Sequence, residues 1–309
     1  MNNLSSFLEL LKGPLKILSR NGKLMAFTAA LYLIFYSISF ILYTYSSNPF
    51  IFDLAIKLFS LVSEHPGTPE FTKLLVDIQE DIGIFLGIEI AYIVLLFFII
   101  VSAETAIIII ASSYYNGDNL SLKELFSMVS RTWTRPFVTS FYVQLLALGY
   151  ISLFFWPLFV PSLVLFHDHP TILIILLVFL GILIITFYLY LSVVWALAVV
   201  VSVVEDSYGI VALGKARELV KGNRVHGFFL NLFLVLVFLL FIPFQLKLSP
   251  SMPIVAAVSQ YVFTCLVSIF QFMAYSVFYF QCKNHMKKSS EGFEYNQIPT
   301  AAVLDEHLP

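Results

Sequence analysis

Residues 82–115 read IGIFLGIEIAYIVLLFFIIVSAETAIIIIASSYY, a run whose charged side chains are Glu89 and Glu104 alone. Crossing about 30 Å of hydrocarbon takes roughly 20 apolar residues in an α-helix, because each residue adds about 1.5 Å. A helix pairs its own backbone N–H and C=O groups, for which lipid supplies no hydrogen-bond partners. The stretch therefore predicts a membrane-spanning helix that is longer than a bilayer needs.

Five further stretches reach the same length: 24–45, 137–156, 171–204, 227–246 and 253–280. The whole chain of 309 residues is 60% hydrophobic and 12% charged, whereas soluble domains average about 25% charged residues. These features predict an all-α integral membrane protein with six transmembrane helices. We expect a single membrane domain over 1–282 and a disordered cytoplasmic tail over 283–309.

Lys and Arg are concentrated on one side of this arrangement. Of the 17 basic residues, 14 precede the first span, follow the second or fourth span, or belong to the tail. Cytoplasmic loops are enriched in Lys and Arg, so both termini are expected in the cytoplasm. Glycosylation of the Asn-x-Ser acceptor at Asn119 would overturn this topology. The net charge of −2 gives no reason to expect a nucleic-acid partner.

Each odd-numbered span follows a segment with apolar residues at helical spacing and basic residues toward its end: 3–21, 119–135 and 208–224. Such segments lie in the membrane plane, with their apolar side toward lipid and their cations among the phosphates. The chain then consists of three units, each an interfacial helix plus a hairpin of two spans. Alternatively, any even-numbered bundle with basic loops looks repetitive. The residues expected to bind lipid headgroups or a partner protein are Lys12, Lys16, Arg20, Arg131, Arg135, Lys215, Arg217, Lys221 and Arg224.

The third segment contains GIVALGKA at 209–216, which is one residue short of a phosphate-binding loop. Such a loop needs a preceding strand and a Ser or Thr hydroxyl for magnesium. Here a membrane span precedes the stretch, and Ala216 stands at the position of the hydroxyl. We therefore interpret it as a helix over 208–221, capped by Asp206 or Ser207 and stopped by Gly222.

The long connection at 46–81 should contain structure of its own, because compact domains seldom have loops of this length. Asn48-Pro49 predicts a break, and a narrow polar stripe predicts a separate helix over 50–62 on the outer interface. Thr68 followed by Pro69 then predicts the start of a helix that runs into the second span.

Glu89 and Glu104 need partners or protons, since a charged residue at the bilayer centre costs about 2.5–3.5 kcal/mol on insertion scales. One interpretation is a proton or cation path, which would make the protein a transporter or channel using Glu104. The other is that each side chain is protonated or bonded to a neighbouring Ser, Thr or Tyr. His167-Asp168-His169 is more typical of a solvated loop than of a metal site, so we expect neither a metal nor a cofactor.

Residues 205–209, which read EDSYG, together with Ala212-Leu213, Lys215 and LVKG at 219–222, resemble the signature of a plant multi-pass membrane family of unassigned function. Residues 102–141 resemble a second block of that family. A more distant similarity extends to the membrane domain that accompanies bacterial glycerophosphodiester phosphodiesterases. The resemblance implies six spans and a location in the endoplasmic reticulum, other endomembranes or the plasma membrane, and it offers no catalytic residues to carry over.

The sequence lacks a Ser-His-Asp set, histidines at metal-ligand spacing and paired carboxylates facing one site. We therefore expect a non-enzymatic protein that organises anionic lipid or a protein partner at its cytoplasmic face. The alternative is a transporter or channel that uses Glu104 as a proton or cation site. Two hypotheses concern traffic. Cys282 is placed for palmitoylation at the end of the last span, and residues 295–298 fit a tyrosine-based sorting signal.

Overall fold

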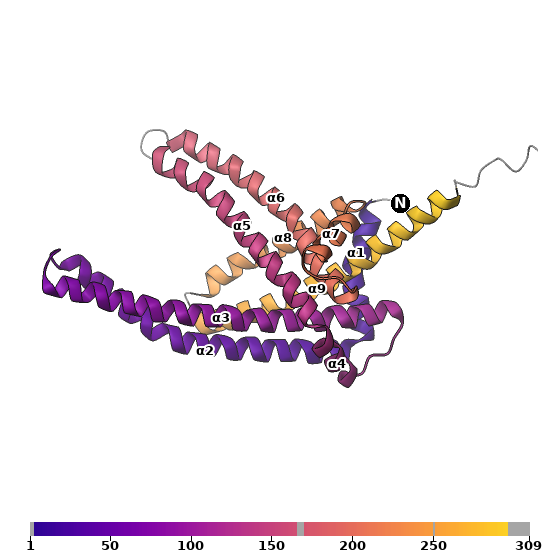
Figure 1. Ribbon diagram of the computed structural model, residues 1–309, viewed down its shortest axis with the longest axis horizontal. Coiled ribbons are helices and arrows are strands. Elements are labelled where there is room, and N and C mark those ends of the chain that lie inside the picture. The colour runs from indigo at the N-terminus through magenta and orange to yellow at the C-terminus, as the bar shows by residue number, and fades with distance from the viewer. Residues whose placement is uncertain (1–2, 166–169, 250, 296–309) are drawn as a thin grey trace, which may run out of the picture.

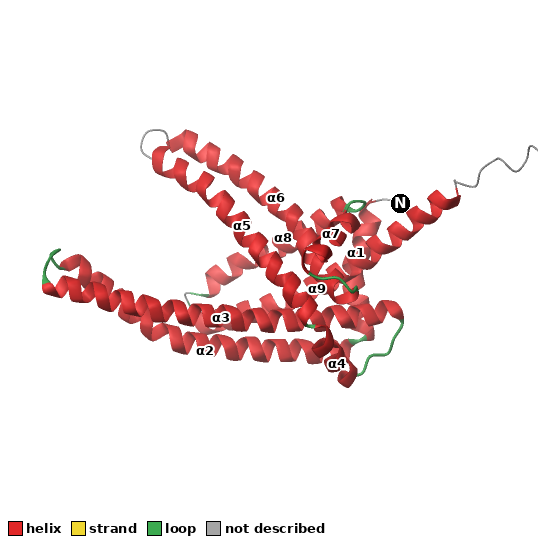
Figure 2. Cartoon of the chain, viewed as in Figure 1, coloured by secondary structure: helices red, strands yellow, loops and turns green. Residues whose placement is uncertain are grey.

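The computed structural model describes residues 3–165, 170–249 and 251–295, and in these residues it consists of α-helices without strands (Figure 2). Six of the helices are long and apolar enough to cross a membrane, which confirms the predicted all-α membrane fold. The helices are α1 (Asn3–Arg20), α2 (Gly22–Ser63), α3 (Pro69–Asn116), α4 (Leu122–Thr132), α5 (Thr134–Leu165), α6 (Pro170–Val204), α7 (Gly209–Val220), α8 (Arg224–Leu248) and α9 (Pro253–Tyr295).

The long helices form three hairpins, α2/α3, α5/α6 and α8/α9, which diverge from one end of the molecule (Figure 1). The short helices α1, α4 and α7 lie at that end, and each precedes one hairpin in the chain. The observed element order is therefore that of the three predicted units. We call this end the basic end, because α1, α4, α7 and the adjoining helix termini carry most of the Lys and Arg residues.

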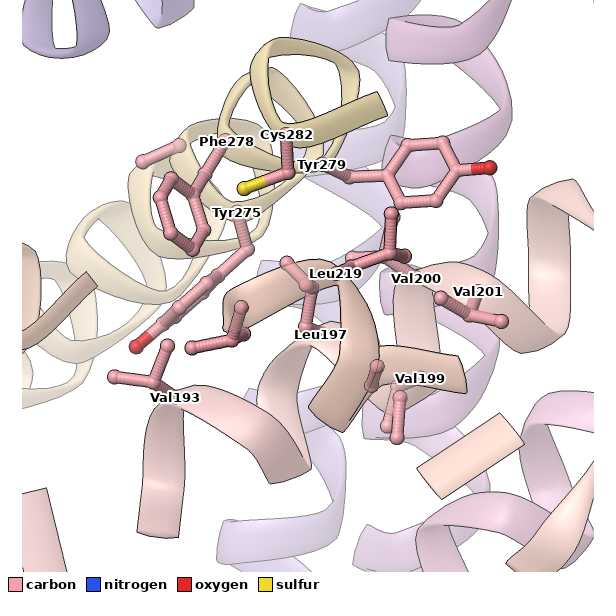
Figure 3. Close-up of a cluster of buried hydrophobic side chains, with 14 of the residues drawn as sticks. Val193, Leu197, Val199, Val200, Val201, Leu219, Tyr275, Phe278, Tyr279 and Cys282 are labelled. Atoms are coloured by element: carbon pink, nitrogen blue, oxygen red, sulfur yellow. The ribbon is translucent and has the colours of Figure 1, made fainter. Parts of the chain in front are cut away.

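The protein core lies at the basic end. Side chains of α6, α7 and α9 pack there into a buried cluster that includes Leu197, Leu219, Tyr275 and Phe278 (Figure 3). Away from this end the long helices expose large apolar side chains, such as the 79% exposed Leu240. Apolar side chains on the outside are expected of helices that face lipid, so tertiary packing is concentrated where the short helices lie.

The predicted break at Asn48-Pro49 is wrong, because α2 continues through Pro49 to Ser63. Proline removes one helix hydrogen bond, but contacts with α3 hold α2 on both sides of it. Before Pro49, the Tyr43 ring stacks on Tyr92 with centroids 4.2 Å apart. After it, the Lys57 amine lies 2.5 Å from an Asp81 carboxylate oxygen.

The predicted start of α3 is confirmed, and the predicted start of the tail is wrong. Thr68 Oγ1 accepts a hydrogen bond of 3.2 Å from the backbone N–H of Phe71, with Pro69 in the first turn. Helix α9 passes residue 283 and continues to Tyr295, so the membrane helix and the start of the predicted tail form one element. Residues 167–169 and 296–309, and with them most of the predicted sorting signal, lie outside the described residues.

Candidate functional site

Helix α1 has three distinct faces. Leu10 and Ile17 are fully buried, and Gly13 packs so closely on α9 that a Cβ atom there would lie 2.7 Å from Cγ1 of Val277. A second face exposes the apolar side chains Leu8, Leu15 and Leu18, and a third exposes Lys12, Lys16 and Arg20. The apolar and basic faces agree with the predicted amphipathic helix, whereas the face that docks on protein was not predicted from the sequence.

Helix α4 begins with the reciprocal capping arrangement of Ser121 and Glu124. The Glu124 carboxylate accepts a 2.9 Å hydrogen bond from the backbone N–H of Ser121, while the Glu124 backbone N–H donates to Ser121 Oγ. The backbone bond first, and then the bond from the Ser121 hydroxyl, hold the pKa of Glu124 below its ordinary value. The helix buries Leu125 and leaves Phe126 exposed, so its apolar residues are divided between the protein core and the surface.

The stretch GIVALGKA is helical, as predicted, and forms most of α7. The predicted cap is wrong, because neither Asp206 nor Ser207 caps the helix: Tyr208 is the N-cap residue and makes no side-chain cap bond. Instead the backbone N–H of Gly209 donates to Oγ1 of Thr139 on α5 at 2.9 Å. The first backbone N–H of α7 is therefore satisfied by a side chain from a distant helix and not by a residue of the preceding loop.

The apolar side of α7 faces protein. Ala212, Ala216 and Leu219 are buried in the cluster formed with α6, α8 and α9. The expectation that this side rests on lipid is therefore wrong, since small residues such as alanine let the helix pack closely on its neighbours. Residues 210 and 211, at the start of the helix, remain exposed.

Glu205, between α6 and α7, joins three elements. Tyr279 of α9 donates a 2.6 Å hydrogen bond to its carboxylate, and the amines of Lys215 and Lys283 lie 3.0 Å and 3.6 Å away. Burial opposes ionisation, but these hydrogen bonds and charges outweigh it and lower the pKa of Glu205. The two ion pairs of Glu205 were not predicted from the sequence, although the residue belongs to the block on which the family resemblance rests.

Some of the basic residues predicted to bind lipid headgroups instead contact other side chains of the protein. Lys215 pairs with Glu205, and Arg135 pairs with Asp206. The guanidinium groups of Arg20 and Arg224 lie over tyrosine rings, 5.5 Å and 6.0 Å from the centroids. Within the described ranges, five of the predicted cations are exposed and make neither an ion pair nor a cation–π contact. They are Lys12, Lys16, Arg131, Arg217 and Lys221.

The two intramembrane carboxylates have different surroundings. Glu89 accepts a 2.5 Å hydrogen bond from the Tyr43 hydroxyl, which confirms the interpretation of a local tyrosine partner. Glu104 is only 8% exposed, and within the described part of the chain it has neither a hydrogen bond nor an ion pair. Tyr32 on α2 is close enough for electrostatic contact with Glu104 and also neighbours Ser268 of α9. The two carboxylates are about 22 Å apart along α3 and belong to separate clusters.

A buried amide, Asn231, connects α8 to α6 and α9. Its amide nitrogen donates to the Leu189 carbonyl at 2.8 Å and to Ser192 Oγ at 2.5 Å, and its oxygen accepts from the Tyr275 hydroxyl. These contacts have no local sequence signal, because the partners of Asn231 lie about 40 residues away in the chain. The network fixes the packing of three spanning helices.

Cys282 is fully buried in the cluster of Figure 3, where the Asn223 amide donates to its Sγ atom at 3.6 Å. The palmitoylation hypothesis does not fit this position, because an acyl chain cannot reach a thiol enclosed by side chains. Across residues 3–165, 170–249 and 251–295, no group of three or more His, Cys, Asp or Glu side chains is arranged to hold a metal ion.

The basic end therefore combines exposed cations, exposed apolar side chains and a tightly packed core on the same short helices. No curated protein and no solved structure matches the chain. A family model, described as a domain of unknown function (DUF8558), matches residues 1–294. Because the match covers most of the sequence, the chain belongs to this family.

Proposed function

We propose that this protein is a non-enzymatic multi-pass membrane protein that gathers anionic lipid headgroups at its basic end. The observation that carries the proposal is the set of five exposed cations on α1, α4 and α7 and at the end of α7 that make neither an ion pair nor a cation–π contact among the described residues. These helices are far apart in sequence but lie at the same end of the molecule (Figure 1). The bias of Lys and Arg toward one side supports a cytoplasmic orientation for this end.

The physical basis is the attraction of each cation to an anionic membrane surface, which contributes about 1 kcal/mol for a Lys or Arg close to that surface. The same helices expose apolar side chains, including Leu8, Leu15 and Phe126, that can enter the interface. Tight docking of α1 and α7 on the core holds the cations in place. A rigid arrangement of several cations favours clusters of headgroups over single ones.

The polar groups at the basic end support a binding role, because they hold the helices together. Glu205 and Asp206 neutralise Lys215, Lys283 and Arg135, which leaves the cations farther from the core free. In such an arrangement the acidic residues stabilise the scaffold, and the free basic residues face the ligand.

The test is the lipid that remains bound to the full chain after purification in mild detergent, measured by mass spectrometry. In the variant Lys12→Gln, Lys16→Gln, Arg217→Gln, Lys221→Gln, we expect the anionic fraction of bound phospholipid to fall several-fold. The matched control is Lys73→Gln, Lys247→Gln, which removes exposed cations from the opposite ends of α3 and α8. An unchanged anionic fraction in the first variant would contradict the proposal, as would retention of a protein partner in place of lipid.

A second candidate function, transport or conduction, is favoured by one observation. The Glu104 carboxyl is buried between membrane helices without a hydrogen-bond partner among the described residues, and such groups are candidates for proton or cation sites. Proton-coupled flux into vesicles that contain the full chain should then be abolished by Glu104→Gln. Glu89→Gln is the matched control, because Glu89 is bonded to Tyr43. Equal flux in wild type and Glu104→Gln would eliminate this function.

A further inference from the structure

A groove of about 520 Å³ lies between α2, α3 and α4. One wall is a stripe on α2 at helical spacing, formed by Phe27, Leu31, Phe35, Ile38 and Leu42. The stripe is about 22 Å long at 1.5 Å per residue. Half of the roughly 30 Å hydrocarbon core measures about 15 Å, so the groove is deep enough for a chain that occupies one leaflet.

The shape of the groove suits a single hydrocarbon chain. A volume of 520 Å³ spread over about 22 Å gives a mean cross-section of about 24 Å². An α-helix with side chains is at least about 10 Å across, which requires close to 80 Å². A narrow groove of this length is therefore better matched to one extended hydrocarbon chain than to a helix from a second copy of this chain or from another protein.

Helix α4 covers the groove at the basic end. Leu125, Phe126 and Val129 line it there, and the Phe126 ring meets Phe27 edge to face with centroids 6.2 Å apart. Both walls and this cover are mainly apolar, whereas the opposite side of α4 carries Lys123 and Arg131. A molecule in the groove thus has its apolar part against α2 and α3 and one end beneath a basic amphipathic helix.

A polar residue lies at this same end: Thr28 lines the groove, is 7% exposed, and makes no hydrogen bond among the described residues. Ser102 of α3 is exposed and lines the groove farther along, near the middle of the α2 stripe, since α3 runs antiparallel to α2 and Tyr92 already lies against Tyr43. Lys23 lies four residues before Phe27, which places it on the same helical stripe, and it is exposed and free of ion pairs within the described ranges.

We propose that the groove binds one acyl chain of an anionic glycerophospholipid, with its ester region at the Thr28 hydroxyl and its phosphate near Lys23. The order of Lys23, Thr28 and the mainly apolar groove along α2 matches the order of phosphate, ester and hydrocarbon in such a lipid. The inference rests on the proposed function and assigns a specific binding site to one of the anionic lipids bound at the basic end.

The test uses the full chain in lipid nanodiscs with a phosphatidylserine analogue that carries a photoreactive diazirine near the end of one acyl chain. We expect cross-links to concentrate in peptides that contain residues 35–42 and 95–99. Ser102→Phe fills the groove and should lower this labelling about tenfold. Ser152→Phe is the matched control, since Ser152 is an exposed serine on the spanning part of α5, outside the groove.

Lys23→Gln tests the headgroup without changing the groove. It should reduce labelling by the phosphatidylserine analogue about threefold or more and leave labelling by the matching phosphatidylcholine analogue unchanged. Labelling spread evenly over the six spanning helices, or unaffected by Ser102→Phe, overturns the groove assignment. Equal labelling of the wild type by both analogues overturns the choice of an anionic lipid.

These failures are distinguishable from failure of the proposed function. Suppose that the groove is not labelled, but that neutralising Lys12, Lys16, Arg217 and Lys221 still lowers the amount of anionic lipid retained on purification. The basic end then binds anionic lipid, and the groove is not one of its binding sites. If that retention is also unchanged, the proposed function fails with it.

Discussion

The backbone N–H of Gly209 donates a hydrogen bond to Oγ1 of Thr139 at 2.9 Å, so α7 starts on a side chain of α5. The same glycine has φ +61°, in the left-handed region, and a Cβ atom there would lie 3.3 Å from the ring of Tyr142. This contact joins the second and third units of the chain and orients the helix that carries Arg217.

Gly209→Ala should destabilise the protein by about 1–3 kcal/mol, because an L side chain is disfavoured at this φ and crowds the Tyr142 ring. Thermal unfolding in detergent measures the effect. The control is Gly214→Ala, a mid-helix position of α7 with open space around the glycine, where alanine should be neutral or stabilising by up to about 1 kcal/mol. Equal melting temperatures of the two variants would refute the proposed role of Gly209.

Gly13→Ala should weaken the docking of α1 on α9 by about 1–3 kcal/mol, because the added methyl group overlaps Val277. Val277→Ala makes room for the methyl group, so the cost of Gly13→Ala should be smaller in that background. A double-mutant cycle of unfolding free energies measures this coupling. Gly22→Ala, at a site with open space, is the control. Strictly additive effects of the Gly13 and Val277 changes would argue against the close approach of α1.

Glu205→Gln should lower the melting temperature at pH 7, because it removes a carboxylate that attracts Lys215 and Lys283. The pKa of Glu205 is lowered in the folded protein, so its contribution is present above the ordinary carboxyl value of about 4.3. That contribution is lost as the pH falls through the lower folded value. The difference between wild type and variant should therefore shrink below about pH 4, whereas the exposed Glu218→Gln serves as a control with little effect. A difference that does not shrink as the pH falls below about 4 would contradict the role of the ionised carboxylate.

Glycosylation in microsomes tests which ends of the helices share a compartment. Pro66→Asn creates an Asn-x-Thr acceptor with Gly67 and Thr68, in the turn between α2 and α3. We expect this site to be glycosylated and the natural acceptor at Asn119, near the basic end, to remain unmodified. A gel shift removed by a glycosidase provides the measurement. Modification at Asn119 in place of residue 66 would invert the topology and place the basic end outside the cytoplasm.

The sequence predicts the spanning helices and the short helices well, because their signals are local. A single apolar run such as 82–115 can pair its backbone N–H and C=O groups in lipid only by forming a helix. The helical spacing of apolar residues in segments such as 3–21 is likewise a property of the segment itself. The cap of α3 at Thr68 is equally local, since its hydroxyl and the N–H that it accepts are three residues apart.

The features that were predicted wrongly or not at all depend on contacts between residues that are distant in sequence. Pro49 does not break α2 because α3 holds the helix on both sides, and α7 is capped by Thr139, 70 residues before Gly209. The sequence predicts that the buried face of α7 lies on lipid, because the spacing of apolar residues is the same whether a helix packs on lipid or on protein. The ion pairs of Glu205 with Lys215 and Lys283 depend on the arrangement of α6, α7 and α9.

The central claim is that the free cations of the basic end select anionic lipid, and the composition of the lipids in contact with the protein tests it most directly. Spin-labelled phosphatidylserine and phosphatidylcholine report the motionally restricted fraction of each lipid around the full chain in vesicles. At low salt we expect a larger restricted fraction for phosphatidylserine, which falls toward that of phosphatidylcholine in Arg217→Gln, Lys221→Gln and at high salt. Equal restricted fractions of the two lipids around the wild-type protein at low salt would contradict the claim.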